Sequence, residues 1–292
     1  MRRKVIQLGA NSLLVSLPSS WVKVHGISKG DEVEVNEAQS SITITSAKTA
    51  KKNRTLALSD NPELAARQIN IAYKRGIDEL EVQYENPKAY SAALEEMKNL
   101  IGFEVVESGK RRAVIKNIAT GDAGDFSTVL RRAFLTLLEM SETAEECVSK
   151  SSKDSVGHLK VAEHNIDRLT DFCKRLLNKQ GMDDTSAITM NYSLLKDIER
   201  IADNYSALAQ AKITKDTAAM LGEIRIQLRA LYELYYSFDQ AKAAKLIEKA
   251  RQLEESAKSL LKSKNPVAAH HIAGIAQMLN EMSWAVCARS FQ

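Results

Sequence analysis

The sequence predicts a multidomain α+β protein in which a short β-rich segment and a small α+β module precede a long all-α region. Three observations predict this class. The chain has 292 residues, enough for two or three domains. Residues 1–50 alternate apolar and polar side chains, as half-buried strands do. After residue 125, apolar side chains recur three and four apart, as they do in helices. We place the domains at residues 1–50, 51–120 and 121–292.

Composition narrows the class of protein further. Hydrophobic residues make up 44% of the chain and charged residues 27%, which is typical of a soluble globular protein. No apolar run approaches the roughly 20 residues of a membrane helix, and no signal-peptide core follows the N-terminal MRRK. We therefore expect a cytoplasmic protein without membrane insertion. Three scattered cysteines, Cys147, Cys173 and Cys287, argue against a disulfide framework and against a CxxC zinc site.

Charge is unevenly distributed along the chain. The net charge is only +4, but no acidic residue precedes Asp31. This acid-free stretch contains five basic residues, Arg2, Arg3, Lys4, Lys23 and Lys29. Such a positive N-terminal end is typical of a protein that meets a phosphate-rich polymer. The alternative is a basic terminus that is merely solvated.

The N-terminal segment reads as two hairpins around a short helix. We expect strands at Arg3–Leu8 and Ser12–Leu17 and a helix at Ser19–His25 that ends at Gly26. The stretches VEVNE and SITIT then alternate like the strands of a second hairpin. A unit this small buries too little apolar surface on its own, so pairing with a second copy is expected.

The stretch VSLPSSWVKVHGISKGDEVEV resembles the AbrB or SpoVT type of swapped-hairpin domain over roughly residues 1–46. Seven residues occupy the diagnostic positions: Leu17, Pro18, Gly26, Gly30, Asp31, Val33 and Val35. The resemblance implies that two chains interleave into one DNA-binding barrel. The best candidates for phosphate contacts are then Arg2, Arg3 and Lys4, and the candidates for base-edge or backbone contacts are Gln7, Asn11 and Ser12. Solvation of a strand edge remains the alternative for each of them.

The middle segment alternates strands and helices in the order βαβαββ after a polar linker at residues 47–54. We expect strands at residues 55–58, 79–84, 103–108 and 111–118, and helices at 61–76 and 87–102. This order predicts a small ferredoxin-like sheet with two helices on one face, serving as a spacer or an effector-sensing module. Its basic group, Lys110, Arg111, Arg112 and Lys116, is either a second nucleic-acid contact or a solvated hairpin. We see no glycine-rich phosphate loop and no nucleophile beside a base, so we do not expect an enzyme.

The remainder of the chain reads as six long helices joined by short connections, which predicts an antiparallel bundle. Their expected ranges are roughly Phe126–Lys150, Lys153–Lys179, Thr185–Lys212, Asp216–Phe238, Asp239–Ser263 and Pro266–Ser290.

Two carboxylates on the third of these helices are the sharpest chemical feature. Glu199 and Asp203 lie four residues apart on the shoulder of an apolar face that includes Ile198 and Ile201. Like charges at this spacing cost a helix about 0.2–0.5 kcal/mol, so we expect a cation, either a side chain or a metal, to face them.

The stretch IERIADNYSALAQ resembles the ERIGD signature of PhoU, the phosphate-uptake regulator family, with Ala202 in the place of the glycine. The preceding helix, KVAEHNIDRLTDF, fits the family's pattern with Glu163 and Asp167. Relative to Ile166 these two acids lie on the shoulder of their helix, so they can converge with Glu199 and Asp203 between neighbouring helices. Four carboxylates there would suit iron or a divalent cation. The alternative is that surface charges neutralise them, namely Lys160, Arg168, Lys196 and Arg200.

A second three-helix repeat has lost most of these acids. Alignment of the two repeats places Ala250, Glu254, Ala273 and Gln277 at the four positions. We therefore expect at most one metal cluster, in the first repeat, and a packing role for the second.

The two resemblances together predict a homodimeric, DNA-binding transcriptional regulator of phosphate uptake, similar in arrangement to archaeal phosphate regulators. Its PhoU-like bundle would sense or dock a partner, such as a phosphate transporter or a sensor protein. The alternative is a metal-binding adaptor that regulates a transporter by protein contact, with an N-terminal domain that only dimerises the chain.

Overall fold

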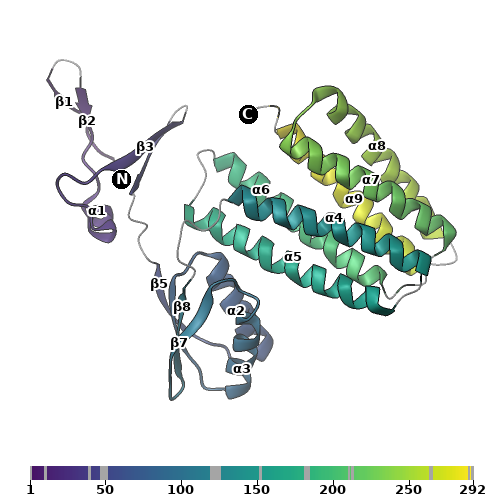
Figure 1. The fold of residues 1–292 in the computed structure, drawn as a ribbon. Coiled ribbons are helices and arrows are strands. Elements are labelled where there is room, and N and C mark those ends of the chain that lie inside the picture. Colours follow the sequence, from purple (N-terminus) through teal and green to yellow (C-terminus); the bar gives the residue numbers. More distant parts are fainter. Residues whose placement is uncertain are drawn as a thin grey trace. The chain divides into compact units, whose positions relative to one another are not determined.

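The computed structural model describes residues 2–9, 12–38, 41–46, 52–118, 126–150, 153–180, 185–209, 211, 214–262, 266–288 and 290. The chain divides into two compact units, Met1–Asn53 and Arg54–Gln292. Figure 1 shows a β-rich N-terminal unit, and a second unit made of an α+β part and a helical part. The observed architecture is that of a multidomain α+β protein, as the sequence predicts.

The first unit contains two antiparallel hairpins and one short helix. Strand β1 (Ile6–Leu8) pairs with β2 (Ser12–Leu14), and β3 (Val33–Ala38) pairs with β4 (Ser41–Ser46). Helix α1 (Ser19–His25) lies between them and ends at Gly26, whose φ of 60° is in the left-handed region that glycine adopts without strain. The two hairpins and the helix confirm the predicted elements, although β1 and β2 are shorter than predicted.

The described residues of the first unit form no buried core. No side chain of this unit whose exposure the structure describes is buried, and α1 buries no side chain. Exposed large apolar side chains occur on both hairpins and on α1: Val5, Ile6, Leu8, Leu13, Leu14, Val15, Val24, Val35 and Ile42. A single copy of this unit therefore leaves the apolar faces of its strands in contact with water, as expected for a fragment of a larger assembly.

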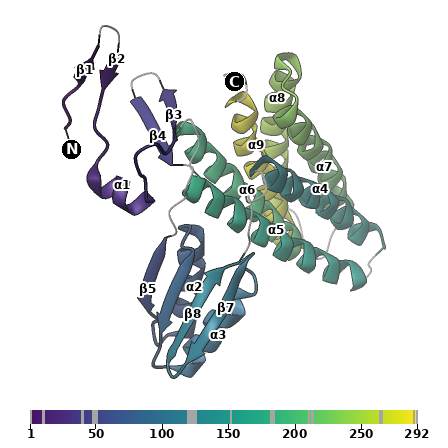
Figure 2. The same ribbon diagram turned by 60° about the vertical axis from the view of Figure 1, so that its left-hand side comes forward.

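The second unit begins with a four-stranded sheet, which we call the middle module together with its two helices. Two asparagines start these helices: Asn61 Oδ1 accepts a hydrogen bond of 2.9 Å from the Leu64 amide, and Asn86 Oδ1 accepts one of 3.0 Å from the Lys88 amide. Both helices lie on the same side of the sheet (Figure 2). The elements are β5 (Asn53–Ala57), α2 (Pro62–Lys74), β6 (Glu79–Gln83), α3 (Pro87–Met97), β7 (Phe103–Gly109) and β8 (Arg112–Asn117).

The strand order of this sheet, β5-β6-β8-β7, corrects the expectation of a ferredoxin-like module. Strand β8 is antiparallel to both β6 and β7, so β6 and β7 run parallel with β8 inserted between them. This is one split βαβ unit. The first strand, β5, lies at the edge directly beside β6. No strand is therefore inserted between β5 and β6, and the unit β5-α2-β6 is not split. The βαβαββ order was therefore predicted correctly, but the ferredoxin-like topology was wrong.

The rest of the second unit is a six-helix bundle at nearly the predicted positions. Helix α4 packs on α5 and α5 on α6, α7 packs on α8 and α8 on α9, and the two trios meet where α4 contacts α7 and α6 contacts α9 (Figure 1). The helices are α4 (Phe126–Lys150), α5 (Lys153–Gln180), α6 (Thr185–Leu208), α7 (Lys215–Tyr236), α8 (Gln240–Ser259) and α9 (Pro266–Ala288).

Helix α5 belongs to two hydrophobic cores. Its Ile166 and Cys173 are fully buried inside the bundle, while Phe172 and Leu176 pack into the core of the middle module. The module and the bundle are thus packed against each other through this helix. None of the described helices combines the length and the apolar composition of a membrane-spanning segment.

Candidate metal site and nucleic-acid interface

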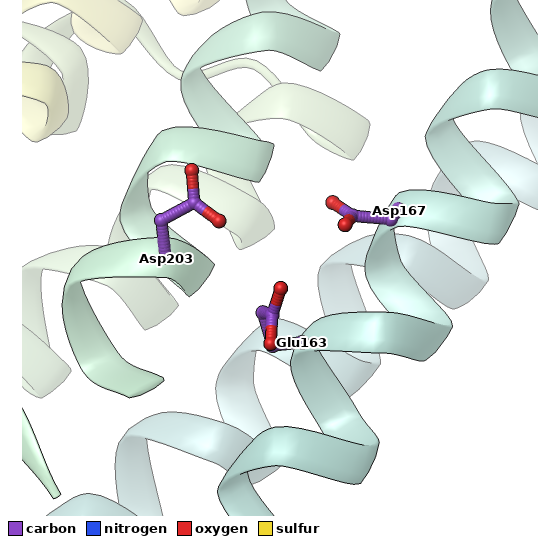
Figure 3. A group of neighbouring side chains, drawn as sticks. All are labelled: Glu163, Asp167 and Asp203. Atoms are coloured by element: carbon purple, nitrogen blue, oxygen red, sulfur yellow. The ribbon is translucent and has the colours of Figure 1, made fainter. Parts of the chain in front are cut away.

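Three carboxylates converge between α5 and α6 (Figure 3), and we call them the acid cluster. Glu163 and Asp167 project from α5 and Asp203 projects from α6. One carboxylate oxygen from each residue lies within 4.8 Å of the other two. The first two side chains are half-buried, and Asp203 is exposed. Ser206 Oγ donates a hydrogen bond of 3.5 Å to Glu163 Oε2.

Helical spacing and the antiparallel pairing of α5 with α6 bring these acids together. Glu163 and Asp167 are four residues apart and therefore share a face of α5. Residues earlier in α5 meet residues later in α6: Glu163 contacts Ser206, whereas Thr170, further along α5, contacts the earlier residue Glu199. Asp203, between Glu199 and Ser206, consequently faces Asp167.

Burial, together with neighbouring carboxylates, raises the pKa values of all three acids. Burial and the neighbouring carboxylates, Glu199 foremost, raise the pKa of Asp167 to about 7. Burial and Asp203 raise the pKa of Glu163, and burial and Glu199 raise that of Asp203. Among the described residues, no lysine or arginine forms an ion pair with the acid cluster. Three carboxylates at this separation, none of them in an ion pair with a lysine or arginine of the described residues, have the donor chemistry of a site for a hard cation.

Glu199 is not the fourth member of this cluster. Its carboxylate forms an ion pair with Lys174 Nζ and accepts a hydrogen bond from Thr170 Oγ1, both on α5. The reason is the four-residue step along α6, which moves Glu199 one turn away from Asp203 and opposite a later part of α5. The cation that the sequence led us to expect beside Glu199 is thus a buried lysine of the facing helix.

The second repeat contains no comparable cluster within the described residues. Ala250 and Ala273 are buried in the bundle. The one remaining acid, Glu254, accepts hydrogen bonds from Lys258 Nζ at 2.6 Å and from Asn280 Nδ2 at 2.8 Å. Gln277 donates to Glu281 at 2.9 Å. This geometry agrees with the packing role predicted for the second repeat.

A buried ionic contact, which sequence reasoning missed, joins α5 to the middle module. Arg175 is 1% exposed. It donates hydrogen bonds to the carbonyl oxygens of Tyr73 at 2.9 Å and Ile77 at 2.7 Å, and to Asp78 Oδ1 at 2.8 Å. Lys179 Nζ reaches the same carboxylate oxygen at 2.6 Å. No local signal marked this contact, because most residues three and four positions from Arg175, namely Asp171, Asn178 and Lys179, are polar and are typical of an exposed face.

A second set of charges extends this contact toward the acid cluster. Asp171, on α5, pairs with Lys74 Nζ of α2 at 2.7 Å and accepts a hydrogen bond from Asn70 Nδ2 at 2.9 Å. Lys174 Nζ lies 3.5 Å from Asp171 Oδ1 and also pairs with Glu199. Charged side chains therefore connect α6 to α2 across α5, and we call these pairs together with the Arg175 contacts the docking network.

Five of the six predicted DNA-contacting residues lie on the exposed surface of the first unit. Gln7 pairs with Leu13 in the first hairpin, and Ser12 pairs with Leu8. Arg3 Nη1 donates to Ser16 Oγ at 3.5 Å. Exposed side chains are found at all five described candidates, Arg2, Arg3, Lys4, Gln7 and Ser12, and the sixth, Asn11, lies outside the described residues.

The basic side chains of the β7–β8 hairpin are largely neutralised by acidic side chains of the same middle module. Arg111 pairs with Glu85, and Lys116 pairs with Glu79 at 3.0 Å. Arg112 makes contacts of 2.8 Å with Glu81 and 2.7 Å with Glu107. These pairs favour the interpretation as a solvated hairpin over a second nucleic-acid contact.

Comparison with known proteins identifies the N-terminal segment. Residues 6–52 match the family model described as antidote-toxin recognition MazE, bacterial antitoxin. The N-terminal β region is thus a MazE/AbrB-like swapped-hairpin domain. The match ends before the middle module and the bundle. No curated protein and no solved structure matched the chain.

Proposed function

We propose that the protein is a dimeric, DNA-binding transcriptional regulator. The observation that carries this proposal is a MazE/AbrB-like domain whose apolar strands are exposed in a single copy and whose basic end contains no acid before Asp31. A second copy would cover the apolar surface, and the basic residues would face phosphate. A DNA partner also supports a cytoplasmic location.

DNA binding is tested by its salt dependence. The double variant Arg2→Ala, Arg3→Ala removes two candidate phosphate contacts. If both are made, the slope of log affinity against log salt concentration should fall by about 1.8, or 0.9 per lost contact. The control variant Arg67→Ala, Lys98→Ala removes the same charge from the exposed surface of the middle module and should leave the slope unchanged. Absence of duplex binding at low salt, or equal losses in both variants, would contradict the proposal.

The family description also raises antitoxin-type regulation, in which the same domain would accompany binding to a toxin protein. Co-purification from the native cell separates the two roles. A stoichiometric small protein bound to the chain would favour the antitoxin role, whereas a chain that carries only DNA fragments would favour the regulator.

We further propose that the bundle is PhoU-like and links the regulator to phosphate uptake. The support is the ERIADN stretch and the arrangement of the bundle as two three-helix units. Its partner would be a phosphate transporter or a sensor protein. Genome-wide mapping of bound DNA at high and low phosphate tests this link. Binding sites that are unrelated to phosphate genes and indifferent to phosphate would refute it.

The acid cluster supports a metal-binding role, including the alternative of a metal-loaded adaptor. Glu163, Asp167 and Asp203 would hold iron or a divalent cation, while Glu199 would stay paired with Lys174. The bound ion would hold α5 and α6 together through its charge. Elemental analysis should show less metal in Asp203→Asn than in the native protein, and no change in the control Glu254→Gln. Equal metal content in all three proteins would exclude the site.

A further inference from the structure

A pocket of about 560 Å³ lies between α4 and α5 and is bordered by the middle module; we call it the junction pocket. Its volume is within the range of small-molecule sites. Arg132 and Glu139 line it from α4, and Ile101 borders it from the middle module. His158, Asn165 and Arg168 line it from α5. Neither the DNA-binding proposal nor the acid cluster uses these side chains.

The charges in this pocket favour an anion. Two arginines on facing helices oppose one carboxylate, that of Glu139. Neither arginine forms an ion pair with the residues that the structure describes. In particular, Arg168 does not neutralise the neighbouring Asp167, which was the alternative that the sequence left open. The arginine fork is therefore available to a ligand.

Arg168, which lines the pocket, has one buried atom without a hydrogen-bond partner among the described residues. Arg168 Nε is buried, and it has no hydrogen-bond acceptor among the described residues. Buried nitrogen donors are rarely left unpaired, because the lost hydration is not repaid. A ligand oxygen could repay it once the Arg168 side chain shifts, because Nε is sealed from water in this structure.

We propose that the junction pocket binds a small molecule carrying a phosphate or carboxylate group. A guanidinium matches either group with two parallel hydrogen bonds, and two guanidiniums from opposite walls can hold one group between them. Asn165 and His158 supply further polar groups for the rest of the molecule. This site is independent of the DNA-binding and metal proposals.

The position of the pocket gives such a ligand contacts with two parts of the second unit. Ile101 follows α3 in the middle module, and its carbonyl accepts a hydrogen bond of 2.9 Å from Tyr73 on α2. A ligand held by Arg132 and Arg168 would therefore touch the bundle and the module at once. The site is placed where an effector can reach both.

Calorimetric titration of the full-length protein with inorganic phosphate and, separately, with succinate tests the proposal. A chelator is included so that metal at the acid cluster cannot bind the anion. We expect one of the two anions to bind with a Kd of about 1 mM or tighter, which also tells phosphate from carboxylate. Failure of both anions to bind would overturn the proposal.

Variants of opposite sign make the test specific. Arg168→Gln and Arg132→Gln should each weaken binding by roughly tenfold, whereas Glu139→Gln should strengthen it because a repulsive charge is removed. The control Arg251→Gln changes an exposed arginine on α8 and should have no effect. An equal loss in Arg251→Gln, or weaker binding in Glu139→Gln, would refute the site. Melting of each unliganded variant, and the conservative Arg168→Lys, separate lost binding from lost folding.

Discussion

Replacement of Arg175 by alanine tests whether the docking network holds the middle module on the bundle. The side chain is almost fully buried and donates to two backbone carbonyls and one carboxylate of the module. Its guanidinium carbon also lies 5.0 Å from the ring centre of Tyr73 and 5.3 Å from that of Phe103. The variant therefore loses three hydrogen bonds and two cation–π contacts and leaves polar groups without donors.

The expected cost follows from these contacts. Removal of one partner from a buried ion pair costs about 3–5 kcal/mol, because a charge is left buried without compensation. Lys179 remains 2.6 Å from Asp78 Oδ1, which places the expected cost at the lower end of this range. We therefore predict that the free energy of local opening at the interface falls by about 3 kcal/mol, or roughly a hundredfold in the opening equilibrium.

Hydrogen exchange of the α2 and α5 amides measures this equilibrium directly. The control Arg200→Ala removes an exposed arginine whose nearest carboxylate, that of Asp197, is 3.8 Å away, and it should cost less than about 1 kcal/mol. If Arg175→Ala speeds exchange in α2 no more than Arg200→Ala does, the assignment of the interface to this network is wrong.

Three further predictions concern the acid cluster and the first unit. The pKa of Asp167 is raised from 3.8 to about 7, so the native state holds a proton that the unfolded state releases, and stability should fall as pH rises from about 4 to 7. Asp167→Asn should flatten this part of the melting profile. An unchanged profile would show that Asp167 is not the cause. Gly26→Ala should destabilise the first unit by about 1 kcal/mol in melting experiments, because the φ of 60° disfavours a residue with a Cβ, although no other atom would lie within 4 Å of that Cβ. The control Gly157→Ala, in an open helical position, should be stabilising. Leu13→Glu should convert the dimer to a monomer in light scattering, whereas the control Val267→Glu, at an exposed position on α9, should not. A dimer in both variants would show that the first hairpin is not part of the interface.

Periodicity and caps were sufficient to predict most helices of this chain. The apolar positions of α5 and α6 recur at helical spacing, and Leu159, Ile166, Ile198 and Ile201 are all buried as expected. Asn61 and Gly26 marked a helix start and a helix end correctly. These signals are local, since each depends on residues within about one helical turn.

The features that were missed depend on contacts between segments far apart in the chain. The insertion of β8 between β6 and β7 is set by strand pairing, which a βαβαββ order does not specify. Glu199 was assigned to the acid cluster because spacing along one helix does not fix its register against the next. Arg175 contacts residues about a hundred positions away, so nothing near it in sequence indicated its partners.

Helix α5 is where the sites of the second unit meet, because different sides of it face different neighbours. Glu163 and Asp167 face α6, Arg168 lines the junction pocket beside α4, and Arg175 is bound by the middle module. A ligand bound at one of these sites changes the charge next to side chains that form another of the sites. Metal at the acid cluster would offset carboxylate charge beside Glu199, whose partner Lys174 also lies near Asp171 of the docking network. If the sites are coupled, the linkage must be reciprocal, so an anion in the junction pocket would change metal affinity by the same factor by which metal changes anion affinity.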